Sequence, residues 1–316
     1  MALHPFGITS TVFLVLYSIV FICLVAGFAA QRSSFKSRWA FLLFHVVVRL
    51  GAQSVGIALD QYGVASSTGL ALLKAFITLS AEGYLTLVLC ILRQLISWQR
   101  RSFGHSWVHG KSDKSYLKLS YKEASQSPEF ILDLMLGAAN ALVIVGGLLP
   151  LAMDRDKIVE AWETDAPLIQ SSKALRGVGQ GIFLAITIFA VTALGHDAFT
   201  RSKRVSSKLR TEITILVAAC PFIVVRGAFG LAQAVDSMIN FAGPYIYSGA
   251  YGGSFETSFV IKEAVLATAM EWCTCACLLA TAMAAPSKSH QADADSDADV
   301  ETAVAPSVDG GKSPKG

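Results

Sequence analysis

Charged and polar side chains recur at intervals of four residues within apolar stretches of the chain. His45, Arg49 and Gln53 form one such series, and Glu82 and Glu271 lie in two others. Residues four apart lie on one face of a helix. Inside a membrane, such a face can line a cavity for a ligand, a proton or a substrate, or it can fix helix register and packing. The candidate site residues are His45, Arg49, Gln53, Glu82, Asn140, Arg226, Gln233 and Glu271.

The depths of these residues predict two ion pairs. Along helices that rise 1.5 Å per residue, Arg49 and Glu82 each lie about ten residues from the expected cytosolic ends of their helices, and Arg226 and Glu271 each lie about 14. Both pairs come from helices adjacent in sequence, so we expect Arg49–Glu82 and Arg226–Glu271 pairs. An unpaired charge at this depth would cost about 3 kcal/mol on insertion scales. Pro221 should bend the helix that carries Arg226.

The elements that must position these residues are membrane-spanning helices. Of the 316 residues, 53% are hydrophobic and 16% are charged, whereas a soluble domain has about 25% charged residues. A helix needs about 20 apolar residues to cross a bilayer core of ~30 Å. We therefore expect an all-α, polytopic seven-helix transmembrane bundle over residues 1–285. The net charge of +3 is too small to suggest nucleic-acid binding. The predicted spans are 8–30, 39–60, 69–92, 130–152, 175–196, 212–235 and 261–284.

The distribution of lysine and arginine predicts the orientation of the bundle. The first, third and fifth loops together carry 15 Lys and Arg residues, the fourth carries two, and the second and sixth carry none. By the positive-inside rule, the N-terminus should be outside or lumenal and the C-terminus cytosolic. Basic loops 93–128 and 197–210 would then face cytosolic protein partners. The same count does not distinguish the plasma membrane from the endoplasmic reticulum.

Three further segments have distinctive compositions. Residues 286–316 contain three Lys and six Asp or Glu residues, which with few apolar side chains predicts a disordered, acidic cytosolic tail. Residues 241–256 are rich in glycine and aromatic residues. This loop would cap an outward-facing pocket or lie in the membrane interface. Gly177, Gly179 and Gly181 open a membrane helix and follow no strand, so they indicate close helix packing and not a phosphate-binding turn.

Several motifs resemble cofactor sites, but the surrounding sequence argues against each of them. His105 and His109 could share a metal on a helix, but the chain has six histidines and no second motif of this type. The three cysteines in the segment 273–277 alternate around a helix and are expected to be packing residues. Lys262 lies at the outer end of its helix, which argues against a retinal Schiff base. We therefore expect no metal and no cofactor.

The topology is that of G-protein-coupled receptors, but the class A signatures are missing. Arg93 ends the third helix in LRQ instead of DRY, and the seventh helix has no NPxxY motif. The topology alone is therefore a fold-level analogy and carries no function.

Three short motifs give a closer similarity. They are VRLGA at 48–52, PFIVVRG at 221–227 and ME at 270–271. These motifs resemble an uncharacterised family of fungal seven-transmembrane integral membrane proteins, over about residues 8–285. The resemblance implies a fungal source, and it supplies no known activity, substrate or cofactor. The charged residues on matching positions are Arg49, Arg226 and Glu271.

Three functions remain open. The preferred one is receptor-like binding of a small ligand in a polar, ion-paired core. The second is a membrane-embedded acid/base enzyme of a fungal secondary-metabolite pathway, similar to terpene cyclases, in which Glu82 or Glu271 would protonate a lipophilic substrate. Pairing with arginine argues against this, and none of the recognisable cyclase motifs is present. The third is a small-solute or proton-coupled transporter, although the sequence has no internal repeat.

Overall fold

A computed structural model describes most of the predicted bundle. The described residues are 3–30, 38–63, 66–106, 108, 128–153, 160–161, 164, 166–236, 239 and 255–284. All secondary structure in these ranges is helical. The predictions for the acidic tail 286–316, for most of the loop 241–256 and for His109 lie outside the described residues.

Seven spans in the described part of the chain are long and apolar enough to cross a membrane, as the sequence predicted. The first six are α1 (Pro5–Ala29), α2 (Arg38–Tyr62), α3 (Ser67–Phe103), α5 (Pro128–Leu148), α7 (Pro167–Thr200) and α8 (Ser207–Val235). The seventh joins α10 (Thr257–Glu263), the π-helical segment η5 (Ala264–Ala269) and α11 (Met270–Ala284). Two short 3-10 turns, η2 (Pro150–Ala152) and η3 (Ser202–Arg204), lie at helix ends. The described part of the chain is therefore all-helical, and its seven spans are those of a multi-pass membrane protein.

Local sequence signals set several helix ends. Ser66 caps α3 by accepting a hydrogen bond from the Gly69 backbone N–H at 2.9 Å. Gly104 ends the same helix with a φ of 75°, a left-handed conformation that glycine adopts without steric cost. Pro167 begins α7, where its missing N–H would have no helical partner in any case. Both helices run beyond the predicted spans, which stop short because they were set by apolar residues and the helix ends include polar ones.

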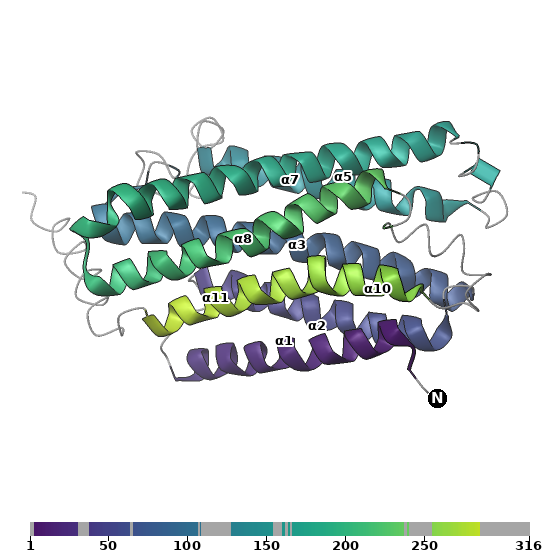
Figure 1. The fold of residues 1–316 in the computed structure, drawn as a ribbon, viewed down its shortest axis with the longest axis horizontal. Coiled ribbons are helices and arrows are strands. Elements are labelled where there is room, and N and C mark those ends of the chain that lie inside the picture. The colour runs from purple at the N-terminus through teal and green to yellow at the C-terminus, as the bar shows by residue number, and fades with distance from the viewer. Residues whose placement is uncertain are drawn as a thin grey trace, which may run out of the picture. The chain divides into compact units, whose positions relative to one another are not determined.

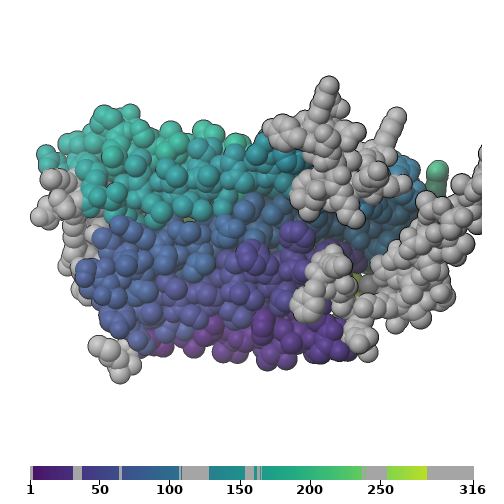
Figure 2. Space-filling model, turned by 180° about the vertical axis from the view of Figure 1, so that it is seen from behind, coloured from purple at the N-terminus to yellow at the C-terminus, as the bar shows by residue number. Residues whose placement is uncertain are grey.

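The spans form a ring in chain order. Consecutive spans contact one another, and α1 contacts α11, which closes the ring. α3 also contacts α7, α8 and α11 across the bundle, so it is the most central helix. Figure 1 shows α7 and α1 on opposite sides of the bundle, and the view from behind in Figure 2 shows α2 and α3 between them. Side chains of α3 are therefore within reach of most of the other spans.

α1 has one face packed against the bundle and an opposite apolar face that is exposed. Tyr17 and Leu24, seven residues apart, are buried against the bundle. Ile8, Val15 and Ile22 share the spacing of seven and are 53%, 56% and 65% exposed. Residues seven apart lie on nearly the same face of a helix. The exposed face of α1 is therefore suited to contact with lipid.

A smaller aromatic cluster holds the end of the bundle where α1 begins. The ring of Phe6 lies 4.6 Å from that of Phe255 and 5.4 Å from that of Phe76, measured between centroids. Phe255 also packs on Phe259 of α10. Phe255, near the end of the predicted 241–256 loop, is therefore fixed to α1 and α10 by aromatic contacts.

Candidate functional site

Glu271 of α11 is the centre of a buried, ion-paired network. Its carboxylate pairs with Arg226 of α8 and with Arg49 of α2. Arg226 Nε lies 2.5 Å from Glu271 Oε1, and all three side chains are at most 6% exposed. These residues form what we term the Glu271 triad. The predicted Arg226–Glu271 pair is confirmed, whereas the prediction that Arg49 pairs with Glu82 is wrong.

Arg49 reaches Glu271 because Gly83 of α3 leaves its path open. A Cβ atom at residue 83 would lie 2.6 Å from Arg49 Nε and 2.7 Å from its Cζ, closer than such atoms approach. The guanidinium group therefore lies against the bare backbone of α3. Arg49 and Glu271 lie on helices that are far apart in the sequence, and closure of the ring brings α11 within reach of α2.

Glu82 has a different partner. Asn140 Nδ2 of α5 donates a hydrogen bond to Glu82 Oε2 at 2.6 Å, which joins α3 to α5. Successive residues differ by about 100° around a helix, so Gly83 can face Arg49 while Glu82 faces α5. The two candidate carboxyl groups therefore differ in environment, with an amide at Glu82 and two guanidinium groups at Glu271.

His45 and Gln53 are buried on α2 together with Arg49, as their spacing predicted. His45 Nδ1 lies 2.9 Å from the Gly83 carbonyl oxygen and 2.9 Å from Thr86 Oγ1. A carbonyl oxygen only accepts hydrogen bonds, so the contact assigns the proton to Nδ1 and leaves Nε2 as an acceptor. His45 Nε2 is buried and has no hydrogen-bond partner among the described residues.

Gln233 of α8 binds a second carboxylate on the seventh span. Its Nε2 donates a hydrogen bond to Glu263 Oε2 at 2.7 Å. Gln233 and Arg226 are seven residues apart, whereas their partners Glu263 and Glu271 are eight apart. The π-helical segment η5 lies between the two glutamates and accommodates the extra residue, because a π-turn is one residue longer than an α-turn. Both carboxylates therefore face α8.

Tyr84 and two glycines shape the surroundings of Arg226. Arg226 Cζ lies 4.8 Å from the centroid of the Tyr84 ring, a cation–π contact. A Cβ atom at Gly227 would lie 2.5 Å from the Tyr84 hydroxyl, and one at Gly230 would lie 2.5 Å from Gln180 Oε1. The bare backbone of α8 thus lets side chains of α3 and α7 approach the triad.

The network contains buried polar atoms that lack a hydrogen-bond partner among the described residues. They include Arg49 Nε, Arg226 Nη1, Gln180 Oε1 and Asn140 Oδ1. Most buried polar groups in proteins have at least one partner. The network therefore presents donors and acceptors of α2, α5, α7 and α8 to a further polar group.

A second ion-paired cluster joins α2, α3 and α8 at the end of the bundle where α8 begins. Glu212 Oε1 lies 2.9 Å from Arg38 Nη1 and 2.5 Å from Arg101 Nη2, and the Glu212 side chain is 1% exposed. Trp98 Nε1 of α3 also donates a hydrogen bond to the Leu209 carbonyl oxygen of α8 at 2.8 Å. We term Arg38, Arg101 and Glu212 the Glu212 cluster.

The sequence prediction misses the Glu212 cluster, because it ends the third span at residue 92 and counts Arg38 and Arg101 as loop charges. α3 continues past both its predicted end and Arg101. A signal was present in the sequence, since Glu212 is the only acidic residue between Asp197 and Asp236.

Two shallow depressions lie away from the Glu271 triad, and neither encloses space for a water molecule. One lies between α3 and α5, and its lining includes Arg93 and Asp133. The other is lined by residues of α3, α7 and α8 that include Thr187. The triad itself is enclosed by side chains, so a ligand would reach it only with a change in helix packing.

The described residues contain no group of three or more His, Cys, Asp or Glu side chains placed to hold a metal ion. Comparisons of the chain with protein-family models, curated proteins and solved structures give no match. The function must therefore be argued from the geometry of the site.

Proposed function

We propose that the chain is a receptor-like membrane protein in which a small ligand acts on the Glu271 triad and thereby changes the packing of the Glu212 cluster. The observation that carries this proposal is the position of Pro221. It lies inside α8 between Glu212 and Arg226, the α8 members of the two clusters. One continuous helix, with a proline inside it, thus connects the buried network with the end of the bundle.

Pro221 makes α8 deformable between the clusters. It has no backbone N–H, so the carbonyl group of residue 217 loses its usual helical hydrogen bond, and the ring disfavours straight helix geometry. Glu212 lies 14 residues from Arg226, or about 21 Å along the helix. A small change of angle at Pro221 would therefore displace Glu212 from Arg101, and such contacts weaken steeply with distance.

The Glu271 triad is suited to respond to a ligand because it holds more positive than negative charge. Two arginines share one carboxylate, and each also has a buried nitrogen without a partner among the described residues. A small ligand with an acceptor group would satisfy these donors and compete with Glu271 for the arginines. Because entry requires helix movement, binding would favour one packing of the bundle over another.

The resemblance to the fungal seven-transmembrane family involves the residues of the Glu271 triad. Arg49, Arg226 and Glu271, which fall on the matching positions, are the three members of the triad. We propose membership of that family, and from the loop charges we propose that the Glu212 cluster lies at the cytosolic end.

The enzyme alternative has less support from this geometry. Glu271 accepts a hydrogen bond from Arg226 and is also ion-paired with Arg49, and Glu82 accepts a hydrogen bond from the Asn140 amide. Neither carboxyl group therefore presents a free proton donor to a substrate.

Hydrogen–deuterium exchange of the purified protein tests the coupling without a known ligand. Glu271→Gln removes the negative charge of the triad, and we expect faster exchange in residues 207–216 at the start of α8. The matched control is Glu82→Gln, because Glu82 is also a carboxylate within a membrane span but bonds to α5 and not to α8. We expect this control to leave exchange in residues 207–216 unchanged. Equal effects of the two variants on this segment would contradict the proposal.

A further inference from the structure

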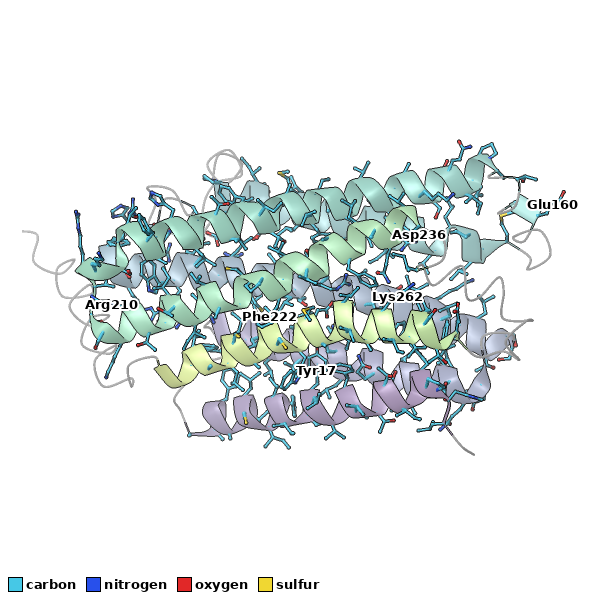
Figure 3. The ribbon with its side chains drawn as sticks, in the orientation of Figure 1. Tyr17, Glu160, Arg210, Phe222, Asp236 and Lys262 are labelled. Atoms are coloured by element: carbon cyan, nitrogen blue, oxygen red, sulfur yellow. The ribbon has the colours of Figure 1, made fainter. Side chains whose placement is uncertain are left out.

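The connection between α7 and α8 carries a concentrated positive charge. It contains no Asp or Glu between residues 198 and 211. We term residues 201–210 the basic turn. Figure 3 shows Arg210 at the end of the bundle opposite Asp236. The basic residues of the turn are Arg201, Lys203, Arg204, Lys208 and Arg210, and all but the half-buried Arg201 are exposed.

Among the described residues, the neighbouring acidic side chains pair with the half-buried Arg201, whose Nε lies 3.6 Å from Asp197 Oδ1, but with none of the exposed cations of the basic turn. Asp197 and Glu212 flank the basic turn, and each is 1% exposed. Asp197 Oδ2 accepts a hydrogen bond from Gln99 Nε2 at 2.7 Å, and Glu212 is held in its own cluster. The acids thus point into the bundle while the bases point out. The side chains of Lys203, Arg204 and Lys208 form no ion pair with another described residue.

Local contacts fix the shape of the basic turn. Arg210 donates from Nε to the Ser202 carbonyl oxygen at 3.2 Å and from Nη2 to the Lys203 carbonyl oxygen at 3.4 Å. The guanidinium of Arg201 lies over the Phe103 ring of α3, with 5.1 Å between Cζ and the centroid. The exposed cations are therefore presented on a folded turn and not on a long unstructured loop.

An exposed aromatic side chain lies next to the basic turn. Phe199, near the end of α7, is 86% exposed. Aromatic and basic residues together at the end of a spanning helix are typical of the membrane interface, where the ring enters the acyl boundary and the cations meet the headgroups. This composition is typical of a segment at the depth of lipid phosphates.

We propose that the basic turn binds the phosphate groups of anionic phospholipids in the adjacent leaflet. Charge complementarity selects this occupant, because clusters of about four to eight Lys and Arg residues beside a spanning helix attract anionic headgroups. The inference goes beyond the proposed receptor function and is independent of it, since it uses no residue of the Glu271 triad.

Native mass spectrometry of the full chain in detergent tests the proposal. The probe is dioleoyl phosphatidylinositol 4-phosphate, and dioleoyl phosphatidylcholine is the neutral reference. We expect the triple variant Lys203→Gln, Arg204→Gln and Lys208→Gln to bind the anionic lipid at least about tenfold more weakly, since each basic residue near a membrane contributes roughly a factor of five. Binding of phosphatidylcholine should not change.

Three matched variants sharpen the test. Lys203→Arg with Lys208→Arg keeps the charge and should keep the affinity. Ser206→Asp keeps a helix-capping side chain at the start of α8 but adds a negative charge, so it should weaken binding. Lys262→Gln removes an exposed charge from α10, away from the basic turn, and should have no effect.

Two results would overturn the proposal. Binding by the triple variant within twofold of wild type would show that the basic turn does not hold the lipid and serves orientation alone. Equal binding of deacylated glycerophosphoinositol 4-phosphate would assign the turn to soluble phosphates instead of lipids.

Discussion

Glu271→Gln should be the most destabilising single change in the Glu271 triad. Glu271 neutralises two buried arginines, whereas loss of Arg226 still leaves Glu271 paired with Arg49. Removing one partner of a buried ion pair costs about 3–5 kcal/mol, because an uncompensated charge remains. We therefore expect Glu271→Gln to lower the free energy of unfolding by about 3–5 kcal/mol. Arg226→Gln should cost about 1.5–3 kcal/mol, the range for a hydrogen bond to a charged group.

The free energy of unfolding would be measured by titrating the protein in detergent micelles with sodium dodecyl sulfate and following the fluorescence of its five tryptophans. Adding Arg49→Gln to Glu271→Gln removes one unpaired arginine, so the double variant should be more stable than Glu271→Gln alone. Glu82→Gln retains an acceptor for Asn140 and should cost less than about 1.5 kcal/mol. Equal losses for Glu271→Gln and Glu82→Gln would refute the reasoning.

Three further changes follow from close contacts. Gly83→Ala should cost about 1–3 kcal/mol in thermal or detergent unfolding, because its Cβ would lie 2.6 Å from Arg49 Nε; an unchanged stability would show that the guanidinium does not lie there. Gly179→Ala should cost a similar amount, since its Cβ would lie 2.6 Å from a carbonyl oxygen of α5, whereas Gly181→Ala, with nothing within 4 Å, should be neutral or stabilising. Glu212→Gln should speed hydrogen exchange at the start of α8, and protection equal to wild type would argue against the ion-paired cluster.

The spans were predictable because the length of an apolar stretch is a local property of the sequence. The Arg226–Glu271 pair was predictable for a related reason, since the two residues lie at matched depth on consecutive antiparallel helices. The pairing of Arg49 with Glu271 was not predictable, because it depends on closure of the ring and on the missing side chain of Gly83. A long-range contact of this type has no signature in the spacing of either partner.

The glycines of α7 show the same limit at a finer scale. The sequence indicated close packing at Gly177, Gly179 and Gly181, but only at Gly179 would a Cβ atom meet another helix, while the other two have nothing within 4 Å. Composition identifies a helix suited to close packing, and the tertiary arrangement decides which face is used.

The π-helical segment η5 also could not be predicted from the sequence. Glu263, Ala267 and Glu271 follow one another at intervals of four residues, and all three are buried. An undistorted α-helix would rotate Glu271 by about 80° from Glu263 over eight residues. The register with α8 is kept by a π-turn, and no local motif in this segment indicates one.

The distance between the ends of α3 and α8 tests the central claim that the triad controls the Glu212 cluster through Pro221. Spin labels at Arg100→Cys and Ser207→Cys, both exposed positions, would report it by double electron–electron resonance with the exposed Cys23 changed to Ser. We predict that Glu271→Gln lengthens or broadens the distance distribution and that adding Pro221→Ala reverses this change. A distribution unaffected by Glu271→Gln, or a change that persists with Pro221→Ala, would contradict the account.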